Sequence, residues 1–596
     1  MYMKPDEWPN LVAMFFDQAE ALADAPFMWS KHGGAYRPQS WRAVAGEVSA
    51  LSRGLRAAGV GPGDRVALVS ENRPNWVVAD LAIMAAGAVT VPAYVTNTTD
   101  DHHYILSHSG ASAAIVSTGA LARRLLPAAA KAPDLRFVVA MEPPDGGGGH
   151  GVEVAAWTDV MARGREQDDD VAGKAAAIDR GALACIIYTS GTGGRPKGVM
   201  LSHAAIQCNV WGAYDLLSVL GLENEVFLSF LPLSHSYEHT AGLYLPIAIG
   251  AQIYHAEGVE TLTANLVEAR PTIMTCVPRL YETMRGRILA GVKRSGGLKA
   301  RLFGAALALG RKRYEAPGSL SFGERIVDRL VERLVRDKVR ARFGGRLKAL
   351  VSGGGPLNYD VGLFFVALGL PVLQGYGQTE AAPVVSCNRP GKAKLHTVGP
   401  PLAGVEVRIA GDGEILVRGE LLMDGYLTDP DATAEALKDG WLHTGDIGVI
   451  DDDGFIQITD RKKDIIVNSG GDNIAPQRVE GILALEPEIA QAMVYGDKRA
   501  HLVALIVPDA DFAGSYAAER GLDAKLAALA EDDGFRKAIG EAVSRAGGGL
   551  SAVERVKRFA ITAEPFSIDN GELTPTIKIR RHAIVARYRE VLEALY

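Results

Sequence analysis

The sequence predicts an α/β protein. We expect a large N-terminal domain of mostly parallel sheets flanked by helices, a small β-barrel-like subdomain, and a small α+β C-terminal domain. Up to about residue 400, helical and strand patterns alternate, as in βαβ units around a parallel sheet. Beyond it, short strands and turns follow one another, and a charged run at 460–464 precedes a compact mixed segment. A chain of 596 residues, 48% of them hydrophobic, is also too long for one ordinary domain.

The first 200 residues carry the alternation. Apolar side chains at every third or fourth position indicate amphipathic helices, and short apolar runs bounded by Gly, Pro or polar residues indicate buried strands. In chain order we expect a helix at 41–58, a strand at 65–70, a helix at 75–86, a strand at 89–93, a surface loop at 143–149, a polar connector at 164–173 and a strand at 182–188.

Residues 279–348 differ from the rest of the chain in charge. They contain 19 Lys and Arg against six Asp and Glu, an excess of 13 positive charges. Between these charges, apolar residues recur at helical spacing: Ile326, Leu330, Leu334 and Val335. One interpretation is a solvated helical hairpin packed by this apolar stripe. The other is a face that rests on anionic lipid.

The last 200 residues change pattern twice. Short strands are expected at 405–409 and 414–417, and 451–454 reads as a hairpin turn. We place a boundary at about residue 460, between an N-terminal domain of residues 1–459 and a C-terminal domain of residues 460–596. Within the C-terminal domain we expect a strand at 503–507 and a long terminal helix after Lys578.

Composition narrows the functional classes. A net charge of −7 gives no reason to expect nucleic acid. The four cysteines lie far apart, so neither a zinc site nor a disulfide framework is suggested. The N-terminus lacks the apolar core of a signal peptide, and the apolar stretch 81–95 is too short to cross a bilayer. A cytoplasmic protein is therefore expected.

The segment 189–198 reads Thr-Ser-Gly-Thr-Gly-Gly-Arg-Pro-Lys-Gly, between an apolar strand and an expected helix. Glycines let several backbone N–H groups point at one anion, hydroxyls add donors, and Lys197 adds a mobile positive charge. A Walker A loop ends in Gly-Lys-Ser or Gly-Lys-Thr. Here Pro196 precedes the lysine and Gly198 follows it, so the segment predicts phosphate binding of another kind.

This loop resembles that of the adenylate-forming enzymes, which include acyl-CoA synthetases, luciferases and nonribosomal peptide adenylation domains. The resemblance runs from about residue 10 to the end of the chain and continues through five more segments in the expected order. These are 352–357 (SGGGPL) beside the adenine, 374–380 (QGYGQTE) for adenine and magnesium, 442–446 (LHTGD) for the ribose, 460–464 (DRKKD) as interdomain hinge, and 575–579 (PTIKI) with the catalytic lysine.

The resemblance implies an ATP site with Mg²⁺. Thr189 and Glu380 would hold the metal, Tyr376 would stack on adenine, and Asp446 with Arg461 would bind the ribose. The implied catalytic residues are Lys578, which would reach the α-phosphate and the attacking carboxylate, with Thr189, Glu380 and Lys197. The implied nucleotide-binding residues are Thr189, Ser190, Gly191, Thr192, Gly193, Lys197, Gly353, Gly354, Gly355, Gln374, Gly375, Tyr376, Gly377, Thr379, Asp446, Arg461 and Lys578.

The resemblance also implies a second step. The mobile C-terminal domain would rotate after adenylation, and the loop at 469–473 would replace the lysine loop as coenzyme A enters. The implied hinge and coenzyme A residues are Asp460, Lys463, Ser469, Gly470 and Gly471.

Other segments resemble the long-chain fatty acid–CoA ligases within this superfamily. Segment 231–240 (LPLSHSYEHT) resembles their acyl tunnel, with His235 and Gly377 as pocket residues, and 338–346 and 570–578 also resemble that branch. Two positions depart from relatives. Ala381 stands where many have threonine, and His239 stands where some bacterial members have a gating tryptophan.

Three functions remain open. The first is a long-chain fatty acid–CoA ligase that uses ATP, fatty acid and coenzyme A. The second is a fatty acyl-AMP ligase that loads a carrier protein, and the third is a non-catalytic lipid-binding protein at a membrane surface. Monomer and homodimer are both open, as is peripheral contact with an anionic membrane at its inner face.

Overall fold

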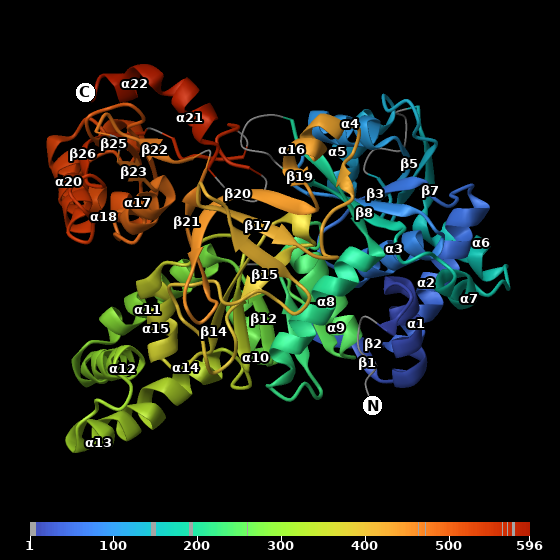
Figure 1. Ribbon diagram of the computed structural model, residues 1–596, viewed down its shortest axis with the longest axis horizontal. Helices are drawn as coiled ribbons and strands as arrows, with labels where there is room; N and C mark the ends of the chain where they lie inside the picture. Colours follow the sequence, from blue (N-terminus) through green and yellow to red (C-terminus); the bar gives the residue numbers. More distant parts are fainter. Residues whose placement is uncertain are drawn as a thin grey trace.

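A computed structural model describes residues 7–144, 151–189, 195–258, 260–462, 464–470, 472–562, 564–568, 570–574 and 579–596. Two eight-stranded sheets form most of the molecule, and a smaller sheet and a C-terminal α+β part are attached to them (Figure 1). In the described residues, no helix is both long and apolar enough to cross a membrane.

The first large sheet has the strand order β15–β14–β13–β12–β10–β11–β1–β2. Its inner pairs are parallel, and only the pairs β1–β2 and β14–β15 at its two ends are antiparallel. The strands are β1 (Pro26–His32), β2 (Ala35–Ser40), β10 (Val226–Ser229), β11 (Gln252–His255), β12 (Ile273–Cys276), β13 (Ala349–Ser352), β14 (Val372–Gly377) and β15 (Val384–Cys387).

The second large sheet has the order β18–β9–β8–β4–β3–β5–β6–β7. Its pairs from β8 to β7 are parallel, and β9 and β18 add an antiparallel edge. The strands are β3 (Arg65–Val69), β4 (Val89–Ala93), β5 (Ala111–Val116), β6 (Phe137–Ala140), β7 (Glu153–Ala156), β8 (Leu183–Thr189), β9 (Lys197–Ser202) and β18 (Gly425–Tyr426). The prediction of mostly parallel sheets is confirmed.

Helices cover both faces of the second sheet. Val66 and Leu68 of β3 join a core with α1 (Leu11–Leu22), α2 (Trp41–Ala57) and α3 (Pro74–Ala85), whereas Ala67 and Val69 join a core with α4 (Thr99–Ser109) and α5 (Gly119–Ala129). This alternation follows from the two-residue period of a strand. The other helices before residue 270 are α6 (Trp157–Arg165), α7 (Val171–Ala176), α8 (His203–Ser218), the π-helix η2 (Glu238–Tyr244), α9 (Leu245–Ala248) and α10 (Leu262–Ala269). A later helix, α15 (Tyr359–Ala367), lies beside the first sheet.

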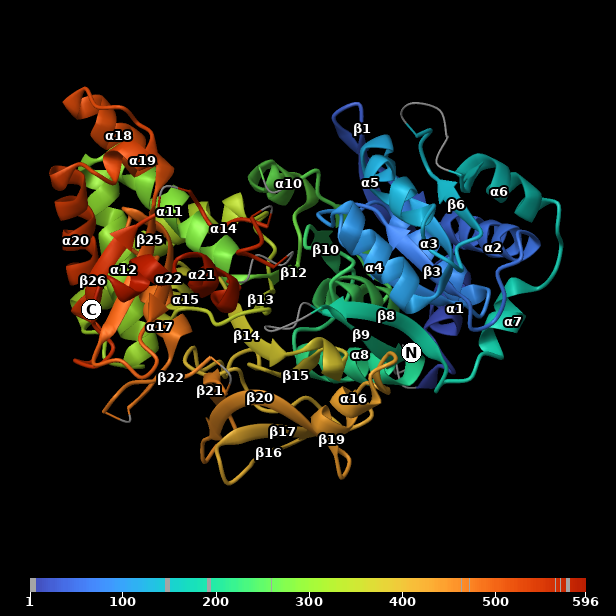
Figure 2. The ribbon, with the colours of Figure 1, turned by 90° about the horizontal axis from the view of Figure 1, so that it is seen from above.

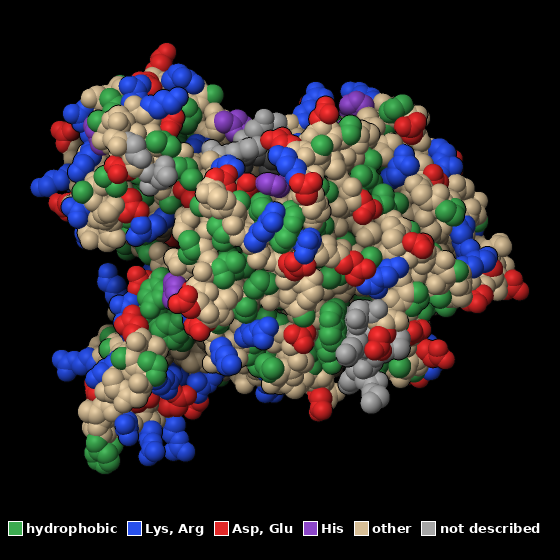
Figure 3. Space-filling view, in the orientation of Figure 1, with side chains coloured by type: hydrophobic (Ala, Val, Ile, Leu, Met, Phe, Trp, Pro, Cys, Tyr) green, Lys and Arg blue, Asp and Glu red, His purple; other side chains and the backbone are tan. Residues whose placement is uncertain are grey.

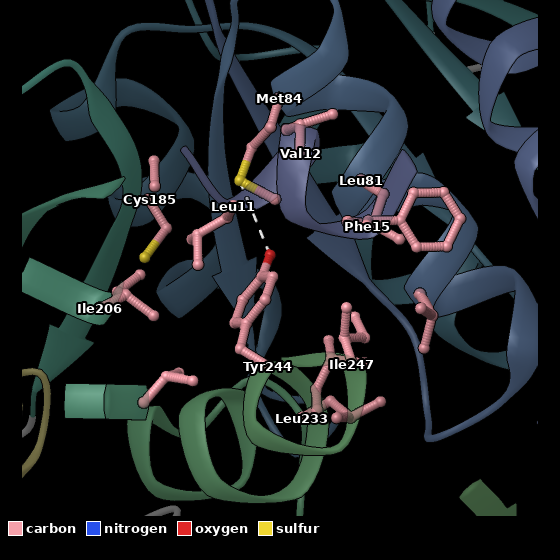
Figure 4. Packing of buried hydrophobic residues seen from close by; sticks show 14 of the residues in the cluster. Leu11, Val12, Phe15, Leu81, Met84, Cys185, Ile206, Leu233, Tyr244 and Ile247 are labelled. Atoms are coloured by element: carbon pink, nitrogen blue, oxygen red, sulfur yellow. Dashed lines mark hydrogen bonds between the residues drawn. The ribbon is translucent and has the colours of Figure 1, made fainter. Parts of the chain in front are cut away.

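The larger core extends from these helices to η2. Figure 4 shows Tyr244 of η2 pointing into side chains from α1 and α3, among them Leu11 and Met84. Its hydroxyl donates to Asp80 Oδ2 at 2.6 Å and lies 3.7 Å from Met84 Sδ. The core therefore fixes the position of η2, which directly follows the segment around His235.

A five-stranded antiparallel sheet stands where the sequence predicts a β-barrel-like subdomain. Figure 2 shows it beneath the two large sheets. Its strands are β16 (Glu406–Ile409), β17 (Glu414–Arg418), β19 (Leu437–Lys438), β20 (Trp441–Ile450) and β21 (Ile456–Arg461), and α16 (Pro430–Ala436) precedes β19. β20 pairs with β17, β19 and β21. Within the described residues, no pairing closes these strands into a barrel.

The C-terminal part has its own sheets and hydrophobic clusters. β22 (Ile466–Val467) pairs with β23 (Asn473–Ile474), and β24 (Ile489–Tyr495), β25 (Leu502–Pro508) and β26 (Val556–Ile561) form a three-stranded sheet. Its helices are α17 (Pro476–Leu483), α18 (Ala510–Arg520), α19 (Leu526–Leu529), α20 (Asp533–Gly547), α21 (Arg581–Arg587) and α22 (Arg589–Glu593).

Residues 278–342 form a helical lobe, at the lower left of Figure 1. Its elements are α11 (Pro278–Ser295), α12 (Gly297–Glu315), α13 (Phe322–Val331), the π-helix η3 (Glu332–Arg336) and α14 (Asp337–Arg342). The segment is helical, as expected, but the interpretation in which its apolar stripe packs the hairpin is wrong for three of the four residues. Val335 is buried, whereas Ile326, Leu330 and Leu334 are exposed, because α13 and η3 turn their other side toward α12.

Two expected elements differ from the structure. The connector 164–173 is shorter, since α6 runs to Arg165 and α7 begins at Val171. Gly164 is no helix breaker: a Cβ there would lie 1.7 Å from the Ala50 carbonyl oxygen, so glycine permits α6 to pack closely on α2. The long terminal helix is two short ones that meet at Tyr588, because tertiary packing overrides helical periodicity there. Part of the loop 143–149 lies outside the described residues.

Candidate active site

A cleft of about 1040 Å³ lies where the two large sheets, the antiparallel sheet and the C-terminal part meet. It is lined by residues that are far apart in the sequence, from Tyr94 to Arg580. The site residues predicted from the sequence that line it are Thr189, Lys197, His235, Gly353, Gly354, Gly375, Tyr376, Gly377, Thr379, Glu380 and Arg461. Polar groups converging in one large cleft mark it as the candidate site.

One end of the cleft is formed by the hairpin of β8 and β9. Thr189 ends β8 and Lys197 begins β9, and the antiparallel register places them opposite each other. The sequence predicts a helix directly after Lys197, and this is wrong. Ser202 is the N-cap and accepts from the Ala205 N–H, so helix α8 begins only at His203. Thr189 and Lys197 are therefore held by a strand pair rather than by a helix N-terminus.

Helix α4 contacts the chain both before residue 190 and after residue 194. Tyr104 donates its hydroxyl hydrogen to the Pro196 carbonyl oxygen at 2.8 Å, and the Arg195 guanidinium lies over the Tyr104 ring at 5.5 Å. His108 Nδ1 lies 2.8 Å from the hydroxyl oxygen of Tyr188, on β8. These contacts anchor the residues next to the predicted phosphate loop to α4, a helix that is buried on one side.

Tyr426 is a site residue that the sequence analysis missed. It lies on β18 opposite Val199 of β9, and its hydroxyl donates to Glu380 Oε1 at 2.9 Å. Lys197 Nζ lies 4.6 Å from the centre of its ring and 3.9 Å from Asp429 Oδ2. Tyr426 thus links the lysine to the glutamate. In the sequence, only the Gly-Tyr pair at 425–426 could have pointed to this residue. The pairing of β18 with β9 is what shows that it lies at the site.

Glu380 lies on a one-turn 3₁₀-helix, η4 (Thr379–Ala381), directly after β14. Thr379 Oγ1 lies 3.0 Å from Ser236 Oγ, which joins this turn to the segment around His235. Gly377 permits a close approach, because a Cβ there would lie 1.9 Å from the Pro383 carbonyl oxygen. Ala381, which departs from many relatives, is fully buried.

Tyr376, Asp446 and Arg461 form a hydrogen-bonded cluster. Asp446 of β20 and Arg461 of β21 are register partners, and Arg461 Nε donates to Asp446 Oδ1 at 3.1 Å. The Tyr376 hydroxyl donates to Asp446 Oδ2 at 2.6 Å. Burial first, and then the charge of Asp446, hold the pKa of Tyr376 well above its ordinary value, so its phenol remains a hydrogen-bond donor. Asp446 is buried beneath the other two and does not itself line the cleft.

The glycines at 353–355 follow β13. Gly353 faces the ring of Tyr237, whose hydroxyl donates to the Val351 carbonyl oxygen at 2.9 Å. Gly354 has a φ of +78°, which favours glycine. Gly355 and Gln374 do not line the cleft, although both are next to residues that do.

The two histidines of the predicted acyl segment have different surroundings. His235 lines the cleft, and its Nδ1 accepts a hydrogen bond from the Tyr237 N–H at 3.2 Å. His239 is buried, and its Nε2 lies 2.9 Å from Asp80 Oδ2. It therefore packs in the core and does not line the cleft.

The C-terminal part reaches the cleft in two places. Asp464 lines it, as do Thr574, Ile579 and Arg580. Leu573 and Ile579 form an isolated antiparallel bridge. The three residues that line the cleft at 574–580 therefore flank the segment predicted to carry the catalytic lysine.

Of the predicted hinge and coenzyme A residues, the three that the structure describes, Asp460, Ser469 and Gly470, do not line the cleft. Asp460 precedes Arg461 on β21, and burial first, then the charge of Asp464, raise its pKa to about 6. Ser469 donates its N–H to the Arg499 carbonyl oxygen at 2.9 Å, and the Gly470 N–H donates to Asn468 Oδ1 at 2.9 Å. Both belong to the turn between β22 and β23.

Seven predicted site residues lie outside the described residues: Ser190, Gly191, Thr192, Gly193, Lys463, Gly471 and Lys578.

Comparison with known proteins identifies the family. Residues 15–427 match the AMP-binding enzyme profile, and residues 463–596 match the profile of the AMP-binding enzyme C-terminal domain. The chain is 33% identical to the long-chain-fatty-acid–CoA ligase FadD15 of Mycobacterium bovis, over 99% of this chain and 97% of that protein. It is also 33% identical to the peroxisomal long chain acyl-CoA synthetase 6 of Arabidopsis thaliana, over 94% of this chain and 82% of that protein.

A solved structure supports the same fold. The adenylation domain of a carboxylate reductase from Mycobacterium chelonae superimposes with a TM-score of 0.78 at 22% identity, covering 99% of this chain and 92% of that one. The sequence matches span almost the whole chain and therefore show the family as well as the fold. The chain is a member of the AMP-binding enzyme family, in the group whose curated members include long-chain fatty acid–CoA ligases.

Proposed function

We propose that this chain is a long-chain fatty acid–CoA ligase. It would convert ATP, a fatty acid and coenzyme A to acyl-CoA, AMP and pyrophosphate through an acyl-adenylate. The observation that carries the proposal is that Tyr376 and Arg461, both held by the buried Asp446, line one cleft with Thr189, Lys197 and Glu380. The near full-length identity to long-chain ligases supports the choice of substrate.

The aromatic ring of Tyr376 is the proposed adenine platform. Its hydroxyl is held by Asp446, so the orientation of the ring is set before nucleotide binds. Asp446 and Arg461 are the proposed ribose contacts, as a carboxylate acceptor beside a guanidinium donor. Arg461 is less buried than Asp446, so it is the member of the pair that is open to a ligand.

The opposite end would bind the phosphates. Lys197 and the loop at 190–194 are the proposed contacts to the β- and γ-phosphates, which leave as pyrophosphate. The Thr189 hydroxyl and the Glu380 carboxylate supply oxygen ligands of the kind that Mg²⁺ prefers, and both line the cleft, so these residues fit the metal. When bound, Mg²⁺ would neutralise charge on the departing phosphates. Tyr426 would orient Glu380 through its hydroxyl.

Lys578 is proposed to neutralise charge between the fatty carboxylate and the α-phosphate as they react. The chain on both sides of it reaches the cleft, through Thr574 and Ile579. We further propose the domain division near residue 460 and a rotation about Asp460 that brings Ser469 and Gly470 toward the cleft for the step with coenzyme A. His235 and Gly377 are the proposed neighbours of the acyl group.

The test is product formation with a panel of saturated fatty acids, with and without coenzyme A. Acyl-CoA and AMP in equal amounts, only when both substrates are present, support the proposal. Fatty-acid-dependent exchange of pyrophosphate into ATP without acyl-CoA would favour the carrier-protein alternative, which acyl transfer to a purified carrier protein would then establish. No exchange with any fatty acid would favour a non-catalytic lipid-binding protein.

A further inference from the structure

The outer helix of the lobe carries an apolar stripe that faces solvent. Phe322, Ile326, Leu330 and Leu334 are spaced four residues apart, and they are 81%, 56%, 51% and 41% exposed. Residues spaced by four lie on one side of a helix. Val331 and Val335 supply the packing on the opposite side, so the stripe is not needed to hold the lobe together.

Every acidic residue of the lobe forms an ion pair with a basic residue of the lobe. Asp328 and Glu332 both pair with the buried Arg336, at 2.7 and 3.0 Å. The other pairs are Glu282 with Arg279, Glu315 with Arg311, Glu324 with Lys312, and Asp337 with Arg340. The excess positive charge of the lobe therefore lies on the Lys and Arg side chains outside these pairs.

Those side chains border the stripe. Arg325, Arg329 and Arg333 each follow an apolar residue of the stripe by three positions, and all three are exposed. Within the part of the chain that the structure describes, none of them forms an ion pair. Figure 3 shows hydrophobic side chains at the outer tip of the lobe, at the lower left, with Lys and Arg side chains beside them.

We propose that this face, Phe322 to Leu334 with its three arginines, docks on a bilayer that contains anionic phospholipid. The apolar side chains would enter the boundary between head groups and acyl chains, and the arginines would bind the phosphates. A second copy of the chain is a poorer occupant. A two-fold dimer through this face would bring like-charged arginines of the two copies together. The inference does not depend on the activity proposed above.

Vesicle sedimentation tests it. The full chain is mixed with vesicles of phosphatidylcholine containing about 30 mol% phosphatidylglycerol, or with phosphatidylcholine alone. We expect binding to the first and at least tenfold weaker binding to the second. Raising the salt from about 0.1 M to about 1 M shortens the screening length about threefold and should release most of the bound protein.

Two variants separate the contributions. I326D with L330D should abolish binding, and R325Q with R329Q and R333Q should weaken it about 100-fold. Their matched controls make the same changes of charge on exposed residues elsewhere, with V219D and L522D for the first variant and K392Q, K537Q and K557Q for the second. Both controls should bind as the unaltered chain does.

Binding equal to that of neutral vesicles, or loss in the controls to the same extent, would overturn the proposal. So would self-association, by sedimentation velocity, that the I326D and L330D changes remove, since this would assign the face to a second copy. The Lys578→Ala chain should bind vesicles normally. A catalytically inactive chain that still binds vesicles would thus refute the proposed function alone.

Discussion

Arg461 donates a hydrogen bond from Nε to Asp446 Oδ1 at 3.1 Å, across two antiparallel strands that place the two residues in register. The 14 residues between them form the hairpin that returns the chain to the cleft. Asp446 also accepts from Tyr376, so one buried carboxylate orients both the proposed adenine platform and the proposed ribose donor.

Asp446→Asn should therefore impair nucleotide binding. The amide keeps the shape of the side chain but loses the charge that holds Arg461, so we expect the KM for ATP to rise about tenfold or more and unfolding free energy to fall by about 1–3 kcal/mol. Steady-state kinetics and denaturant unfolding measure these changes. Asp453→Asn, at the exposed turn of the same hairpin, is the control and should change neither the KM nor stability appreciably.

Tyr426→Phe should lower activity with little loss of stability. It removes one hydrogen bond to a carboxylate, and we expect kcat/KM for ATP to fall about tenfold, equivalent to about 1.4 kcal/mol. Tyr495→Phe removes a similar bond, to Glu593 in the C-terminal part, and should leave kcat/KM unchanged. If both variants lose activity equally, Tyr426 has no particular role at Glu380.

Glu238 should make stability depend on pH. It is fully buried, and burial raises its pKa from 4.5 to about 7 although Thr275 and Ser229 donate hydrogen bonds to it. The folded state therefore keeps the proton that the unfolded state loses, and unfolding free energy falls as pH rises from 4.5 to about 7.

Glu238→Gln cannot titrate. Relative to the unaltered chain, its unfolding free energy should rise across that interval by up to about 3 kcal/mol. Urea unfolding at a series of pH values measures the difference, in which contributions of other groups cancel. Glu541→Gln makes the same change on an exposed helix residue and should give a difference that is constant with pH. A constant difference for Glu238→Gln as well would contradict the assigned pKa.

Lys578→Ala should separate the two half-reactions. Acyl-adenylate formation should fall about 100-fold or more, because a positive charge near the reacting oxygens is lost, whereas thioester formation from supplied acyl-adenylate should remain largely intact. Rapid-quench measurements of each half-reaction provide the test, with Lys557→Ala as control. Equal loss in both steps would contradict the role proposed for Lys578.

Local sequence patterns predicted much of the fold. The helices at 41–58 and 75–86 and the strands at 65–70 and 89–93 agree with the structure to within one residue at each end. The first helix is amphipathic, and the other three elements are buried along almost their whole length, so propensity and packing act in the same direction. Gly164 shows where such patterns fail, because a close contact with a residue more than 100 positions away decided its conformation.

The site could be predicted only in part for the same reason. The motifs located Tyr376, Glu380 and Asp446, but none of them contains the strand pairings that bring these residues together. Tyr426 was missed because its contact with Glu380 depends on the pairing of β18 with β9. The stripe on α13 has the periodicity of a packed helix, and periodicity alone does not say whether an apolar face meets the core or solvent.

The most direct test of the central claim is the isolation of the intermediate. The chain is incubated with a long-chain fatty acid and radiolabelled ATP without coenzyme A, and an aliquot is quenched before and after coenzyme A is added. We predict that enzyme-bound acyl-adenylate accumulates first and is then converted to acyl-CoA and AMP. Acyl-CoA formed with no acyl-adenylate detectable on the millisecond scale, or an acyl-adenylate that does not react with coenzyme A, would contradict it.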